Sequence, residues 1–126
     1  MHALAPRLAA TGSVTLVTGA AARAALPGTS GLAAVNGALE AMARVLAVEL
    51  APRRVNTVSP GLTATEAYAG LPDAARAAMF AATAARLPAG RVGAPDDIAQ
   101  AILLAIANPF LTGATLDVDG GAHLAR

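Results

Sequence analysis

The stretch Val17–Arg23 has residue types that could bind a nucleotide, because a strand-like run is followed by a glycine and small residues. A turn that cradles a pyrophosphate needs further glycines, which let the backbone approach the phosphates. Here three alanines and an arginine follow Gly19, and the next glycine is Gly28. No helix with a clear start follows directly. The pattern therefore favours an ordinary exit from a strand over a phosphate-binding loop.

Carboxylates and imidazoles, the other common catalytic groups, are few and scattered. Asp117 and Asp119 flank Val118, so on a strand their side chains would share a face. Such a pair could promote hydrolysis, but a strand end followed by a turn is the favoured interpretation. His2 and His123 lie near the two ends of the sequence without matching ligands, and the chain has no cysteine. We therefore predict no metal site.

The longest element expected is a helix over Gly31–Leu50, which Ala51-Pro52 ends because proline disfavours helical geometry in the residue before it. Ser30 is expected to cap this helix, and Glu40 with Arg44 to form an exposed pair of small energetic value. Apolar residues recur every three or four positions, which predicts one buried face. That face holds Leu32, Val35, Leu39, Met42, Leu46 and Leu50.

A strand over Arg54–Ser59 follows, rich in β-branched residues and closed by Pro60-Gly61. Other segments complete an alternating order of helices and strands, which predicts an α/β chain with parallel strands. They are a helix tail over Met1–Ala10, strands over Ser13–Thr18 and Thr115–Val118, and helices over Asp73–Leu87 and from Pro95 to Asn108. Because parallel sheets bind ligands at the carboxyl ends of their strands, chemistry is expected at the Pro60-Gly61 turn.

Composition excludes several classes of function. The net charge is +1, all nine basic residues are arginine, and Arg53-Arg54 is the only adjacent basic pair. Nucleic-acid binding has little support, because it needs a concentrated positive surface. No apolar run reaches about 18 residues, so no membrane span is predicted. The absence of cysteine fits the cytoplasm, where we expect the protein.

Four blocks of the sequence resemble the short-chain dehydrogenase/reductase family. They are Leu46–Pro52, Arg54–Gly61, Gly90–Ala99 and Thr112–Gly121. The blocks lie in register over essentially the whole chain, but they match only the second half of the family's pattern. The resemblance implies a Rossmann-like, partial doubly wound sheet of about three parallel strands with flanking helices. We expect residues 1–126 to form a single domain.

The half that is not matched holds the family's glycine-rich loop and the residue that grips the adenosine ribose. The resemblance therefore implies no cofactor for this chain alone, and NAD or NADP only if the other half is supplied. Within the matched half, Pro60, Gly61, Leu62 and Thr65 correspond to the segment beside the nicotinamide and its phosphates. A tight turn after a buried strand explains Pro60 and Gly61 equally well.

The family's catalytic tyrosine, lysine and serine all have replacements in this chain. In the shared register the tyrosine position is Leu32, the lysine position is Asn36, and the serine position is Gly19. A phenol needs a nearby cation to act as a base at neutral pH, but the chain has no lysine and its one tyrosine is Tyr68. We therefore predict no catalytic residue and leave open whether the chain is an enzyme.

A second stripe of small residues on the central helix could pack against another subunit, as the resemblance also implies: Ala33, Gly37, Ala41 and Val48. We expect a homo-oligomer or a complex with a related subunit. Three functions stay open. They are an inactive half-domain that assembles or binds a ligand, an oxidoreductase completed by another chain or an amino-terminal half, and a truncated gene product.

Overall fold

Three parallel strands form the centre of the computed structural model, which describes residues 5–124. They are β1 (Ser13–Val17), β2 (Arg54–Pro60) and β3 (Thr115–Val118), in the spatial order β1-β2-β3. Register pairs such as Val14 with Val55 and Val58 with Leu116 align the strands side by side. The predicted α/β class and the Rossmann-like parallel sheet are confirmed.

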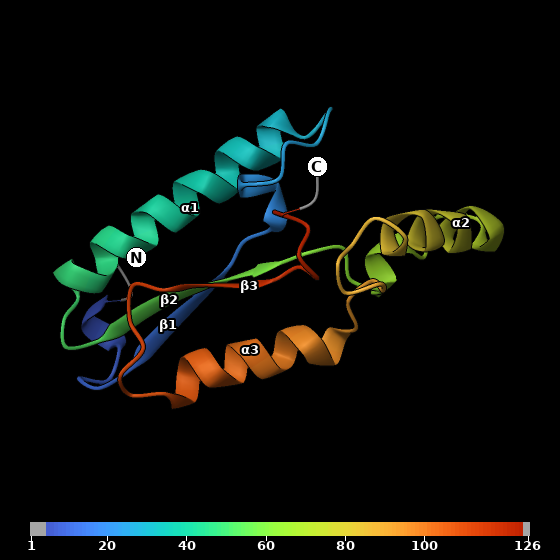
Figure 1. The fold of residues 1–126 in the computed structure, drawn as a ribbon. Helices are drawn as coiled ribbons and strands as arrows, with labels where there is room; N and C mark the ends of the chain where they lie inside the picture. The colour runs from blue at the N-terminus through green and yellow to red at the C-terminus, as the bar shows by residue number, and fades with distance from the viewer. Residues whose placement is uncertain (1–4, 125–126) are drawn as a thin grey trace.

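Helices cover both faces of this sheet. Helix α1 (Ser30–Glu49) and helix α3 (Pro95–Ala107) lie on opposite sides (Figure 1). Helix α2 (Asp73–Ala84) projects away beyond the carboxyl end of β2, and none of its residues is buried. Short 3-10 turns occur at Ala5–Arg7, Ala20–Ala22 and Glu66–Tyr68.

The ends of some elements differ from those predicted. The expected helix tail over Met1–Ala10 is a 3-10 turn within its described part, and residues 1–4, His2 among them, lie outside the described residues. Ser30 is the first residue of α1 rather than its cap, because Thr29 occupies the N-cap position. That Thr29 hydroxyl donates to the Leu26 carbonyl and so closes the preceding turn.

The apolar core lies between α1 and the amino-terminal half of the strands. Ala43, Leu46 and Leu50 of α1 pack on Val55 in the central strand, which has no exposed surface. Val14 and Leu16 of β1 extend this cluster. Burying such aliphatic side chains contributes about 1.5–3 kcal/mol each, so this small cluster is the main support of α1 on the sheet.

The face of α1 that contacts the sheet is rotated from the predicted one. Leu46 and Leu50 are buried as predicted and Leu39 is half-buried, but Leu32 and Val35 are each 62% exposed, and Met42 is also exposed. The helix is apolar on more than one side, so its periodicity does not specify which stripe meets the strands. Toward the carboxyl ends of the strands, the residues of α1 that face the sheet are Glu40 and Asn36. The strand side chains are polar at that end.

Helix α3 packs on the other face in the predicted orientation. Ala105 is fully buried, and Ile98 and Ile102 are half-buried. Its end is fixed by Arg54 at the start of β2. The Arg54 guanidinium donates to the Ala105 carbonyl at 2.8 Å, and to the carbonyls of Ile106 and Leu111. Because the last carbonyls of a helix lack partners within it, this arginine caps α3 and ties it to β2.

Helix α1 is, by length and hydropathy alone, the one helix among residues 5–124 that could cross a membrane. This differs from the expectation from the sequence, which counted uninterrupted apolar runs. In the structure the helix packs on the sheet through Ala43 and Leu46, and its Glu40 forms an ion pair. The same test is passed by a mostly buried core helix and by a signal sequence, and 17% of the apolar window of α1 is buried here.

The Thr15 hydroxyl in β1 is buried and has no hydrogen-bond partner. Thr15→Val keeps the β-branched shape and removes this unpaired polar atom, so we expect it to raise the free energy of unfolding by about 1 kcal/mol. Urea unfolding followed by circular dichroism measures the change. Thr57→Val is the matched control, because the Thr57 hydroxyl donates to Thr115 at 2.6 Å. The control should lower stability, and an equal effect of both variants would contradict the prediction.

Candidate functional site

The Pro60-Gly61 turn lies at the carboxyl end of the central strand, as predicted. Gly61 has a structural reason to be glycine. A Cβ there would lie 2.6 Å from the Asp119 Cα and 2.8 Å from its carbonyl oxygen, distances that real side chains do not tolerate. The Gly61 N–H also donates to the Val118 carbonyl at 3.0 Å. Close packing against the end of β3 therefore explains this glycine without a ligand.

Three of the four predicted cofactor-binding residues line one hollow. Pro60, Gly61 and Thr65 border a space of about 430 Å³, together with Tyr68 and the inner face of α3. Thr65 also borders a neighbouring hollow of about 660 Å³ that reaches Phe80 of α2. Leu62 instead lines a third hollow of about 370 Å³ beside β3. Leu62 thus borders a different hollow from the other three residues, and the cofactor role of all four stays a prediction.

The segment between β2 and α3 forms an excursion that is closed at its base. Thr63 and Gly93 form an isolated parallel bridge, and the Ala64 N–H donates to the Gly93 carbonyl at 2.8 Å. Beyond this bridge the ring of Tyr68 meets that of Phe80 edge to face, 5.6 Å apart. The excursion therefore extends away from the carboxyl end of the sheet (Figure 1), its base is closed by the contacts of Thr63 and Ala64 with Gly93, and its aromatic pair joins the 3-10 turn at Tyr68 to α2.

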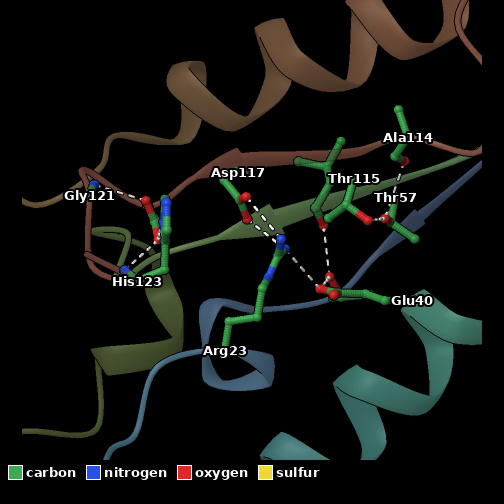
Figure 2. Close-up of polar contacts among 11 residues, drawn as sticks. Arg23, Glu40, Thr57, Ala114, Thr115, Asp117, Gly121 and His123 are labelled. Carbon is green, nitrogen blue, oxygen red and sulfur yellow. Dashed lines mark hydrogen bonds and ion pairs between the residues drawn. The ribbon is translucent and has the colours of Figure 1, made fainter. Parts of the chain in front are cut away.

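A network of charged and hydroxyl groups fills the space between α1 and the carboxyl half of the strands (Figure 2). The Arg23 guanidinium forms a two-pronged contact with Asp117 of β3, at 2.6 and 3.0 Å, and its Nη2 lies 3.2 Å from Glu40 Oε1. The Thr18 hydroxyl lies 3.2 Å from the same Glu40 oxygen. The Glu40 side chain is 8% exposed. The predicted exposed pair of Glu40 with Arg44 is therefore wrong, because Glu40 faces the sheet.

Asp119 and His123 form a second polar contact at the end of β3. The Asp119 carboxylate accepts the N–H groups of Gly121 and His123, and it lies 2.7 Å from His123 Nδ1. Burial by itself would raise the pKa of Asp119, but the hydrogen bonds from His123 and Gly121 outweigh it and lower the pKa. Asp117 and Asp119 thus serve different partners, and they form no hydrolytic pair.

Gly19 and Asn36 meet beside Pro60 at the carboxyl edge of the sheet. A Cβ on Gly19 would lie 3.2 Å from Asn36 Nδ2 and 3.9 Å from the Pro60 carbonyl oxygen. Leu32, one turn earlier on α1, points its side chain largely into solvent. Within residues 5–124, no three His, Asp or Glu side chains gather closely enough to hold a metal ion.

Comparison with known proteins places this geometry in a family. The family model described as enoyl-(acyl carrier protein) reductase matches residues 1–123. The short-chain dehydrogenase/reductase ATR9 of Stachybotrys chlorohalonatus is 41% identical over 112 residues, which cover 89% of this chain and 44% of that protein. The chain belongs to the short-chain dehydrogenase/reductase family.

Other members of this family agree on how much of the fold is present. Carbonyl reductase family member 4 of Danio rerio is 43% identical over 68% of this chain and 34% of its own length. A small-chain dehydrogenase solved in complex with NADPH is 50% identical, with a TM-score of 0.92 over 96% of this chain and 55% of that one. The chain spans about half the length of these relatives, or less.

The family register relates Gly19 and Asn36 to two of the family's catalytic positions. These residues hold the serine and lysine positions that the resemblance assigned, and they lie together at the sheet edge. Neither side chain carries a proton that moves at neutral pH, and the same is true of Leu32 at the tyrosine position. Whether the chain lacks the family's acid–base groups at this edge stays a prediction from the resemblance.

The roles of Arg23, Glu40 and Thr18 do not follow from the sequence alone. In the sequence, Arg23 stands where a phosphate loop would need a glycine, and the spacing of Glu40 and Arg44 indicates a surface pair. The carboxylate that Arg23 binds on β3, Asp117, lies 94 residues away in the sequence. Glu40 follows Asn36 by one helical turn, so both lie on one face. The spacing of Asn36 and Glu40 indicates a shared polar face only once the side of α1 that meets the sheet is known.

The Asp119 contact predicts an acid-sensitive part of the stability. Because the folded state lowers the pKa of Asp119, its contribution is present above its unfolded pKa of about 3.9 and is lost as the pH falls through the lower folded value. We expect Asp119→Asn to lower the free energy of unfolding by about 2 kcal/mol at pH 7, and by less below about pH 4. Chemical denaturation at several pH values measures this.

Asp73→Asn is the matched control for this experiment. Asp73 pairs with Arg76 at 2.6 Å, but its side chain is 91% exposed. A solvent-exposed pair contributes little, so this variant should follow the wild type at every pH. A loss of stability in Asp119→Asn that is independent of pH would contradict the electrostatic assignment.

Proposed function

We propose that this chain is a half-domain of the short-chain dehydrogenase/reductase family that is catalytically inactive alone and acts as an oligomerising or ligand-binding partner. One observation carries the proposal. In the family register Gly19, Leu32 and Asn36 stand at the catalytic positions, and a Cβ on Gly19 would lie 3.2 Å from Asn36 Nδ2 at the sheet edge. The scaffold is thus present without a group that can pass a proton to a substrate.

The ligand that this half-domain would bind is part of NAD or NADP. A relative that is 50% identical over the aligned part was solved with NADPH, and Pro60, Gly61 and Thr65 border an apolar hollow at the carboxyl edge of the sheet. Parallel sheets bind ligands at this edge. We expect contacts to the nicotinamide end only, because the glycine-rich half is not among the matched residues.

A second candidate function, an oxidoreductase completed by another polypeptide, is favoured by the edge of β1. The Thr18 N–H donates to Val58 and the Gly12 carbonyl accepts from Arg54. Because the ladder alternates, the backbone groups of Ser13, Thr15 and Val17 point away from β2. This edge has no charge and no proline, and Val17 is exposed. Such an edge can accept a further strand.

A titration with NADPH separates the two candidates. The chain has no tryptophan, so the intrinsic fluorescence of NADPH is followed without interference. For the isolated chain we expect no micromolar binding and no oxidation of NADPH with a carbonyl substrate, because the acid–base groups are replaced. The completed-enzyme alternative expects turnover when the unmatched part of the NADPH-bound relative is added. Turnover by the isolated chain would refute the main proposal.

The proposed assembly uses the outward face of α1. The small-residue stripe expected from the sequence is only partly available, since Ala33 and Gly37 are half-buried. The exposed apolar side chains of α1 form a larger face instead. They are Leu32, Val35, Met42, Val45 and Val48. A helix with such a face is suited to packing against its own copy across a twofold axis.

Val45 is 56% exposed within this face, and Val45→Glu places a charge there. If α1 pairs with its copy, the variant should raise the dissociation constant of the oligomer at least tenfold, because the charge would be buried in an apolar interface. Light scattering after gel filtration measures the mass. Leu71→Glu, an equal change on the exposed excursion, is the control and should leave the mass unchanged. A monomeric wild type would contradict the assembly.

A further inference from the structure

Arg23 joins three separate elements at the carboxyl edge of the sheet. It follows the 3-10 turn after β1, and its guanidinium reaches Asp117 on β3 and Glu40 on α1. The Asp117 contact is two-pronged, which fixes the plane of the guanidinium as well as its place. Figure 2 shows it lying between the two carboxylates.

The burial of Glu40 makes this contact necessary rather than incidental. A carboxylate with 8% exposure must be paired or neutralised, and Arg23 is the cation beside it. Thr18 adds a hydroxyl to the same oxygen and also lies 3.3 Å from the Val58 carbonyl. The network therefore fixes the end of β1, the loop after it and the middle of α1 with respect to one another.

Asn36 lies one turn before Glu40 on the same face of α1. Its side-chain nitrogen is held 3.2 Å from the Cβ point of Gly19, in the loop that Arg23 anchors. A shift of either α1 or the loop would separate the two. Arg23 is 36% exposed and lines none of the hollows that Pro60 or Thr65 border, so it acts on them indirectly.

We propose that Arg23 is a positioning residue for the ligand site: by joining Asp117 to Glu40, it keeps the Asn36 amide against Gly19 at the carboxyl edge of the sheet. The ligand class is a neutral polar group such as a carbonyl, a carboxamide or a sugar hydroxyl. The three charges of the network leave an excess of one carboxylate, which disfavours an anionic group beside Asn36 and turns the phosphate of a bound mononucleotide away from it. This inference rests on the proposed ligand-binding function.

Side-chain amide resonances test the proposal directly. The chain has three asparagines and one glutamine, so its nitrogen-15 spectrum holds four side-chain amide pairs. Asn56 is an internal reference, because it is fully buried and bonded to Leu111 and Ala114. Nicotinamide mononucleotide is the probe, as it carries the end of the dinucleotide that this half-domain would contact. We expect saturable shifts of the Asn36 amide while Asn56 stays fixed.

Variants then separate positioning from stability. At a temperature where all variants are folded, Arg23→Gln should move the Asn36 amide in the free protein and weaken binding of the mononucleotide about tenfold. Arg23→Lys keeps the charge without the planar fork and should recover part of that loss. Arg86→Gln, which changes an exposed arginine that borders none of the three hollows, is the matched control and should change neither. If Arg23→Gln does not fold, Asp117→Asn leaves the Glu40 pair intact and should show the same shift.

Two outcomes would overturn the inference, and they are distinguishable. If Arg23→Gln only lowers the unfolding temperature, and the affinity and the Asn36 amide match the wild type, Arg23 is structural and the ligand site stands. If the wild type binds no mononucleotide at millimolar concentration, the ligand-binding function fails and the positioning role fails with it.

Discussion

The arrangement of this half-fold depends on one buried charge. Glu40 turns toward the sheet, and its side chain is almost completely removed from water. Burying an unpaired carboxylate costs several kcal/mol, so Arg23 and Thr18 must stay beside it. Because Arg23 also holds Asp117, the charge determines how the loop after β1, the central helix and the last strand fit together.

This constraint divides the interface under α1 into two parts. Toward the amino ends of the strands, Ala43, Leu46 and Leu50 pack on Val55 in an ordinary apolar core. Toward the carboxyl ends, Thr57 and Asp117 of the strands face α1, and polar side chains such as Glu40 lie opposite them on the helix. Parallel sheets commonly bind ligands at that end. The apolar part holds the helix on the sheet, and the polar part shapes the site.

In the proposed function, the site keeps the family's position without the family's acid–base groups. Asn36 and Gly19 stand in contact where the family register puts a lysine and a serine. The hollows that Pro60 and Thr65 border are lined mostly by apolar residues. Together with an open edge on β1 and an exposed apolar face on α1, these features fit a protein that binds or assembles rather than one that completes a reaction by itself.

The sequence by itself determined the class of fold, the three parallel strands and the Pro60-Gly61 turn. Those features depend on local signals: β-branched runs, a proline after a helix, and glycines where backbones approach closely. It also determined the family, because four blocks hold its pattern in register. The rotation of α1 and the burial of Glu40 did not follow from the sequence, because an alanine-rich helix has no single apolar stripe. Only tertiary packing decided them: Asp117 lies 94 residues from Arg23 in the sequence, and the chain has to fold before Arg23 can lie between Asp117 and the Glu40 side of the helix.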